Sequence, residues 1–199
     1  MKTKIFSVIS SLVVVLGLTT STYASSVNSD TYTVLNDISA ITKIEIRGNV
    51  EVYVSDAPAD RVKVYDDYYS GSALVQNKDG VLRIASYKAE KLVVWVSAKD
   101  LRSISAFDNA EVKSFGKLSK INFNVDLHDN ATAKLDMDAF NADLTVRNHA
   151  SIVLTGDANN LNIDRDINAV INSKNLAATH TTENKFSFAA DDNNDLMGM

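Results

Sequence analysis

The chain contains no cysteine, one proline and seven glycines in 199 residues. Without cysteine it can form no disulfide bond and cannot use an N-terminal cysteine as a lipid anchor. So few prolines and glycines leave no segment with the composition of an interdomain linker. We therefore expect one domain of ordinary size, stabilised by packing and by backbone hydrogen bonds.

The chain also lacks an excess of positive charge and, beyond its first residues, a long apolar run. Its 20 lysines and arginines are outnumbered by 25 aspartates and glutamates, which gives a formal net charge of −5. An acidic surface argues against nucleic acid and against anionic lipid headgroups as partners. No segment after the N-terminus offers the roughly twenty apolar residues that a membrane-spanning helix needs.

The N-terminus has the features of a secretory signal peptide. Lys2 and Lys4 precede a largely apolar stretch over residues 5–18, and Thr22-Tyr23-Ala24 fits a cleavage site. We therefore predict a signal peptide over residues 1–24. The expected destination is the periplasm, the outer cell surface or the medium.

A short motif returns four times in the second half of the chain. It reads Asp-Asn-Ala twice, then Asn-His-Ala and Ile-Asn-Ala, with its alanines 21, 19 and 19 residues apart. Apolar and polar residues alternate around each alanine, as in strands with one buried face. This period indicates stacked β-rungs, because one rung cannot cover its own apolar face. The repeated pairs are Asn109 and Ala110, Asn130 and Ala131, His149 and Ala150, and Asn168 and Ala169.

The residue before each alanine is assigned a structural role. Asparagine adopts the left-handed backbone region more readily than other residues except glycine. We therefore expect it to turn the corner between two strands. Asparagine amides stacked on successive rungs can also hydrogen-bond to one another in a ladder.

The predicted fold is all-β: a single-domain, right-handed parallel β-helix, or β-solenoid, with rungs of about 20 residues in the C-terminal half. Residues 31–100 are also strand-rich but less regular, and are expected to form earlier rungs or a capping sheet. The domain is expected to span residues 30–188. An acidic tail over residues 189–199 is predicted to be disordered.

The order of strand and turn segments resembles a known family. The segments are Gly48-Asn49-Val50-Glu51-Val52, Lys78-Asp79-Gly80-Val81, Val93-Val94-Trp95-Val96 and Leu101-Arg102-Ser103-Ile104, followed by the short repeats. Over residues 38–184 the chain is thereby similar to the bacterial "putative auto-transporter adhesin, head GIN domain" family. The resemblance implies an exported, β-helix-like solenoid. One departure is that the family's corners usually carry Ser-Gly-Ser-Gly.

A tyrosine-rich segment is the first candidate for a binding site. Tyrosine rings can stack on sugar faces while neighbouring carboxylates accept hydroxyl hydrogen bonds, and tyrosine is frequent at interfaces. In the alternative interpretation Tyr65 ends a strand with its ring half-buried and the rest is a turn. Trp95 likewise is either packed or an exposed anchor. The candidate segment comprises Tyr65, Asp66, Asp67, Tyr68 and Tyr69.

The edge of the repeats is the second candidate. Stacked rungs would bring His128, Asp129 and Arg147 together, and such a group could act on an acidic polysaccharide. The alternative is a solvated corner on which opposite charges pair. The chain has no Gly-x-Ser-x-Gly elbow, cysteine nucleophile or phosphate-binding glycine loop, so we do not expect an enzyme.

No metal site and no cofactor are expected. Asp136 and Asp138, like Asp164 and Asp166, provide two carboxylates each, whereas calcium takes six to eight oxygen ligands. The three histidines match no zinc-binding spacing.

These patterns predict a noncatalytic, adhesin-like interaction module of the cell envelope or the medium. Its expected partner is a cell-surface glycan or an envelope protein. The alternatives are a carbohydrate-binding or polysaccharide-degrading β-helix protein, and a structural envelope protein that assembles through exposed terminal rungs.

Overall fold

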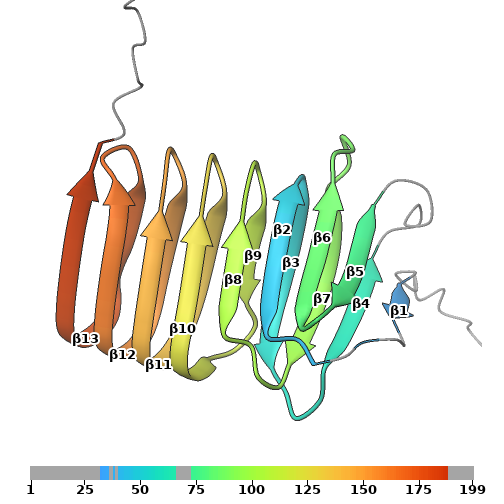
Figure 1. Ribbon diagram of the computed structural model, residues 1–199, viewed down its shortest axis with the longest axis horizontal. Coiled ribbons are helices and arrows are strands. Elements are labelled where there is room, and N and C mark those ends of the chain that lie inside the picture. Colours follow the sequence, from blue (N-terminus) through green and yellow to red (C-terminus); the bar gives the residue numbers. More distant parts are fainter. Residues whose placement is uncertain (1–31, 36–37, 39, 66–72, 188–199) are drawn as a thin grey trace, which may run out of the picture.

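The computed structural model describes residues 32–35, 38, 40–65 and 73–187. All regular elements in this part of the chain are β-strands, so the all-β prediction is confirmed (Figure 1). The segments predicted to be a signal peptide and a disordered tail, and most of the tyrosine-rich segment, lie outside the described residues.

Thirteen strands of the described residues form one curled, open sheet. The strands are β1 (Thr33–Leu35), β2 (Lys43–Gly48), β3 (Val50–Asp56), β4 (Arg61–Tyr65), β5 (Leu74–Lys78), β6 (Val81–Ser86), β7 (Leu92–Ala98), β8 (Ser103–Ala106), β9 (Glu111–Ser114), β10 (Leu118–Leu127), β11 (Thr132–Val146), β12 (Ser151–Asp166) and β13 (Val170–Phe186).

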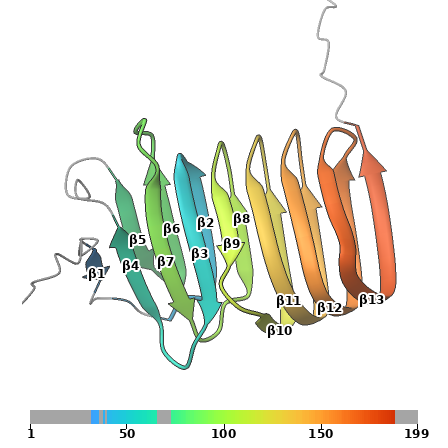
Figure 2. The same ribbon diagram turned by 180° about the vertical axis from the view of Figure 1, so that it is seen from behind.

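The sheet curls so that it has two sides (Figures 1 and 2). Strands β6, β2 and β8 pair with one another on one side, and β7, β3 and β9 pair on the other. The longer β11 joins both sides: residues 132–134 pair with β9, whereas its later residues pair with β10. Each long strand therefore bends near its middle, at the lower end in Figure 1.

The C-terminal strands pair in parallel, with the period that the repeats predict. Val125 pairs with Leu144, and Leu144 with Ile163, which are offsets of 19 residues. We call such a set of equivalent positions a column. Since opposite residues on paired strands share a face, the apolar columns all point inward, and Leu144 is only 2% exposed. The repeated alanines Ala110, Ala131, Ala150 and Ala169 form another buried column.

The N-terminal half differs from the prediction in two ways. The sheet is mixed, because β1–β4, β4–β7 and β5–β6 pair antiparallel. The prediction of parallel pairing therefore does not describe this end of the molecule. In addition, β2 lies between β6 and β8, so the strands are not stacked in chain order.

The corner residue is also not the predicted one. The left-handed conformation is adopted by Asp108 (φ 61°), Asp129 (φ 59°) and Asn148 (φ 56°), two positions before each alanine. A short polar side chain has a second function there, because it accepts a hydrogen bond from the backbone N of the preceding corner. Asp108 N donates to Asp129 Oδ2 (3.1 Å), and Asp129 N donates to Asn148 Oδ1 (3.2 Å).

Gly48 (φ 81°) extends this corner column to an earlier rung. The pairing of Glu51 with Glu111 places Gly48 level with Asp108, and Gly48 N donates to Asp108 Oδ2 (3.0 Å). A Cβ atom at Gly48 would lie 2.1 Å from the Ser86 carbonyl oxygen. Glycine is thus required there by backbone conformation and by space.

An amide ladder forms chiefly at a different column from the predicted one. At the predicted positions Asn130 Nδ2 lies 3.5 Å from Asn109 Oδ1. Shorter bonds of 2.8 Å join Asn160 to Asn141 and Asn141 to Asn122, just after the bend of each strand. The amides therefore connect β10, β11 and β12 on the outside of the sheet.

Candidate functional site

Aromatic rings line the outer surface of the sheet around β3 and β7. Tyr53 and Trp95 are register partners, and their rings stack with centroids 4.8 Å apart and an interplanar angle of 21°. Phe115, just after β9, continues the row at 5.1 Å from Trp95. The rings point outward because the alternate valines of both strands are buried in the core.

The row extends across β4 to β1. Lys63 is the register partner of Trp95, and its Nζ lies 4.7 Å from the centre of the Tyr32 ring. Tyr32 in turn contacts Tyr65, with ring centroids 5.3 Å apart. Tyr32 is 50% exposed and Phe115 61% exposed. We call this surface the aromatic stripe: Tyr32, Tyr65, Trp95, Tyr53 and Phe115.

Charged residues border the aromatic stripe. Tyr53 Oη donates to Glu51 Oε1 (2.8 Å), and Lys113 pairs with both Glu51 and Glu111 while lying 5.7 Å from the Tyr53 ring centre. Burial of Glu51 would raise its pKa, but hydrogen bonds from Lys113 and Tyr53 outweigh burial and lower it. Glu51 therefore stays ionised as a fixed acceptor beside the rings.

The aromatic stripe includes one residue of the predicted tyrosine site. Tyr65 ends β4, and its half-buried ring lies against Tyr32. Trp95 is half-buried between Tyr53 and Phe115, so it is both packed and accessible at the surface. Asp66, Asp67, Tyr68 and Tyr69 lie outside the described residues.

Sequence reasoning missed Tyr32, Tyr53 and Phe115 as members of this surface. The outward parity of Tyr53 and Trp95 is visible in the alternation of their strands. What the alternation does not reveal is that these strands, 42 residues apart, lie side by side.

His128 and Asp129 follow β10 and Arg147 follows β11, so the three residues lie on two neighbouring rungs. The backbone N of His128 donates to Ala106 O, and that of Arg147 donates to Leu127 O. Asp129 Oδ2 accepts the hydrogen bond from Asp108 N.

The His128 ring has partners within the protein. It stacks on Phe107 with centroids 4.7 Å apart, and its Nε2 lies 2.9 Å from Asp126 Oδ1. The Arg47 guanidinium lies over the Phe107 ring, with its Cζ 3.9 Å from the ring centre. Ring stacking and a cation–π contact therefore hold Arg47, Phe107 and His128 together beside the corner.

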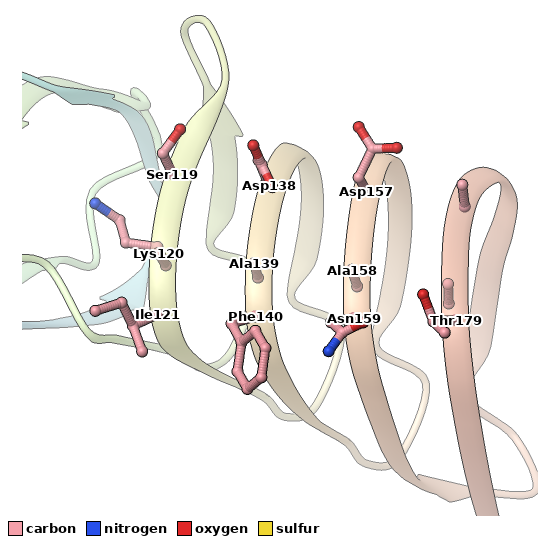
Figure 3. Close-up of a pocket in the computed structure, with 12 residues that line it drawn as sticks. Ser119, Lys120, Ile121, Asp138, Ala139, Phe140, Asp157, Ala158, Asn159 and Thr179 are labelled. Carbon is pink, nitrogen blue, oxygen red and sulfur yellow. The ribbon is translucent and has the colours of Figure 1, made fainter.

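A second surface feature is a groove across β10 to β13, at the bends of these strands (Figure 3). We call it the lateral groove. Its volume is about 740 Å³, within the range of ligand sites. Three columns line it: Ser119, Asp138, Asp157 and Ala177; then Lys120, Ala139, Ala158 and Ala178; then Ile121, Phe140, Asn159 and Thr179.

In the part of the chain that the structure describes, no group of three or more histidine, aspartate or glutamate side chains is placed to hold a metal ion. None of the described segments is a helix of the length and apolarity that would cross a membrane.

Solved structures share this fold. A putative adhesin from Parabacteroides merdae has a TM-score of 0.64 at 14% identity, over 79% of this chain and 78% of that one. A putative lipid binding protein from Parabacteroides distasonis has a TM-score of 0.59 at 11% identity, over 78% of each chain. A putative adhesin from the same species has a TM-score of 0.55 at 16% identity, over 78% of this chain and 77% of that one.

At these identities the structural likeness establishes a shared fold. No curated protein matches the chain. The family described as "putative auto-transporter adhesin, head GIN domain" matches residues 40–190, which include all the strands from β2 to β13. This chain belongs to that family.

Proposed function

We propose that this protein is an exported, noncatalytic, adhesin-like module of the cell envelope that binds a glycan through the aromatic stripe. The C-terminal rungs act as a rigid β-solenoid scaffold with a right-handed course. The observation that carries the proposal is a pair of ring groups on one outer sheet surface. Tyr53, Trp95 and Phe115 form one group and Tyr32 and Tyr65 the other, and Lys63 lies between them as the register partner of Trp95 and over the Tyr32 ring.

Rings on a sheet suit a sugar chain for two reasons. An aromatic face is apolar and flat, like the face of a pyranose ring, and the tyrosine hydroxyls and bordering charges can bond to sugar hydroxyls. The sheet also fixes the rings before binding, so less conformational entropy is lost when the ligand is bound. Lys63, Lys113 and Glu51 supply donors and acceptors beside the rings.

A polysaccharide-degrading activity at His128, Asp129 and Arg147 receives less support. The ring of His128 is engaged by Phe107 and its Nε2 by Asp126, and Asp129 holds the adjacent corner. These contacts account for the side chains of His128 and Asp129 without a substrate. The family and the solved structures of this fold whose names carry a function are described as adhesins or as lipid binding.

A glycan and polysaccharide array on the purified protein tests the proposal, with release of reducing ends measured for each bound glycan. We expect binding without cleavage. Changing Phe115 and Tyr32 to alanine should abolish binding while the protein stays folded, because both rings are at least half exposed. The matched control is Ile167→Ala, another exposed apolar residue far from the stripe. Cleavage, or binding that survives the double change, would overturn the proposal.

A further inference from the structure

We propose that the lateral groove is a second binding site, independent of the aromatic stripe, and that it takes an extended polypeptide segment in which basic and apolar side chains alternate. The proposal depends on the different chemistry of the two walls of the groove and on the distribution of charge around it.

Alanines line the floor of the groove at three of its four rungs. Ala139 and Ala158 are register partners in β11 and β12, and Ala158 pairs with Ala178 in β13. Ala139 and Ala158 face the core and are 3% and 5% exposed, so the strand backbone forms the floor of a trough between the outward columns on either side. Adjacent strands are about 4.8 Å apart, so four rungs give a trough roughly 14 Å long. That length matches about four residues of an extended chain at roughly 3.3 Å per residue.

One wall carries an excess of negative charge. Asp138 and Asp157 are register partners on neighbouring strands, and both are exposed (Figure 3). Like charges directly opposite one another in a sheet repel. Lys117 Nζ reaches Asp157 Oδ2 at 3.3 Å, and its pKa is raised chiefly by that hydrogen bond and further by Asp136 and Asp138. The positive charge of Lys117 is thus shared among Asp157, Asp136 and Asp138.

Lys120, the basic residue among those that line the groove, does not neutralise this wall. Lys120 Nζ pairs with Asp56, and its side chain is almost fully buried. The wall formed by Asp138 and Asp157 therefore favours a cationic partner, since an anionic glycan or an acidic peptide would increase the repulsion.

The opposite wall of the groove is apolar in β10 and β11. Ile121 is 76% exposed and Phe140 is 55% exposed, and Figure 3 shows them on the side away from Asp138 and Asp157. Asn159 and Thr179 continue this wall and can bond to a main chain. Large side chains that remain exposed together in this way mark contact surfaces.

An extended peptide matches both walls at once. Successive side chains of an extended chain point to opposite sides, so every second residue would face the carboxylates and the others would face Ile121 and Phe140. A neutral glycan would use Phe140 but would leave the pair Asp138 and Asp157 uncompensated. The alternating pattern is therefore the feature that the groove should select.

Calorimetric titration with the peptide acetyl-Lys-Leu-Lys-Leu-Lys-Leu-amide tests this proposal, with an isomer carrying three lysines followed by three leucines as its control. We expect the alternating peptide to bind more tightly than the isomer. Changing Asp138 and Asp157 to asparagine should weaken binding by at least about tenfold. Changing Asp79 and Glu90 to asparagine and glutamine removes the same charge elsewhere and should leave binding unchanged within about twofold.

Two single variants make the test sharper. Phe140→Ala should weaken binding without unfolding, because its ring is exposed. Lys117→Gln should strengthen binding because it frees Asp157, whereas Lys78→Gln, a remote change of the same charge, should not. Absence of binding, equal binding of the two peptides, or equal loss in both double variants would overturn the proposal. So would binding of a neutral oligosaccharide that depends on Phe140 and not on the two aspartates.

Discussion

Arg165 Nε lies 2.7 Å from Glu183 Oε1 at the C-terminal end of the sheet, and Glu183 is 39% exposed although it lies in register with an inward-facing column. Glu183 is the register partner of Ile163, in the column that holds Val125 and Leu144 in the preceding strands. Among the described strands β13 pairs with β12 alone, so no described strand covers its other edge. A charged residue facing inward at an open edge makes the addition of another strand unfavourable.

The capping role of this pair predicts a monomer that can be converted into an oligomer. Changing Thr181 to leucine and Glu183 to isoleucine would extend the apolar columns of Leu161 and Ile163 to the open edge. Light scattering after size exclusion should then show self-association that rises with protein concentration. Thr182→Leu adds an apolar side chain on the outer face and should leave the protein monomeric. An unchanged monomer in the double variant would refute the capping role.

Two substitutions three residues apart should differ greatly in their cost. Leu144→Asp places a charge among buried residues and should lower the free energy of unfolding by about 4 kcal/mol or more. Asn141→Asp removes one amide donor of the ladder, from Asn141 to Asn122, and should cost about 1 kcal/mol. Urea denaturation measures both. Similar costs would mean that the columns are assigned to the wrong faces.

Two glycines with the same backbone conformation separate strain from crowding. Gly116 has φ 82° and open space around it, so Gly116→Ala should cost about 1 kcal/mol for backbone strain alone. Gly48 has φ 81° and also faces the Ser86 carbonyl oxygen, so Gly48→Ala should cost about 3 kcal/mol or more because β2 and β6 must separate. Equal losses in urea denaturation would argue against close packing at that corner.

Stability should fall in acid through the glutamates of the outer sheet surface. A hydrogen bond from Lys91, the strongest influence, holds the pKa of Glu111 below 4.5, and one from Lys43 does the same for Glu45. A carboxyl whose pKa is lower in the folded protein stabilises it above the pKa of the unfolded chain. This contribution is lost as the pH falls from about 4.5 through the folded pKa.

The free energy of unfolding should therefore decrease between pH 5 and roughly pH 3. Glu111→Gln should reduce this dependence, and Lys91→Gln should reduce it similarly because it removes the partner. An identical pH dependence in the wild type and both variants would exclude this ion pair as a cause.

The periodic residues explain how much of the fold could be predicted. The spacing of Ala110, Ala131, Ala150 and Ala169 correctly predicted parallel pairing at that offset in the C-terminal half, because each rung of about 20 residues pairs with the next rung in the chain. The corner was placed one residue too late, since asparagine at position 109 and aspartate at position 108 both tolerate the left-handed region. The hydrogen bond that the Asp108 carboxylate accepts from Gly48 N, in the adjacent corner, favours aspartate at position 108.

The candidate sites were less accessible to prediction. The placement of His128, Asp129 and Arg147 on neighbouring rungs follows from the repeat, whereas their role as a site stays a prediction. The lateral groove also follows the repeat, but its walls depend on how the strands bend at Ala139 and Ala158, and alternation alone does not specify a bend.

By itself the sequence determined the strand class, the acidic surface and the rung period, because these depend on composition and on local alternation. Tertiary structure alone decided that β2 lies between β6 and β8, and that antiparallel strands close the N-terminal end. It also decided that Tyr32, Tyr53, Trp95 and Phe115 share one surface. The physical reason is that these contacts join strands distant in the chain, and their pairing is selected by the burial of the whole core rather than by any local pattern.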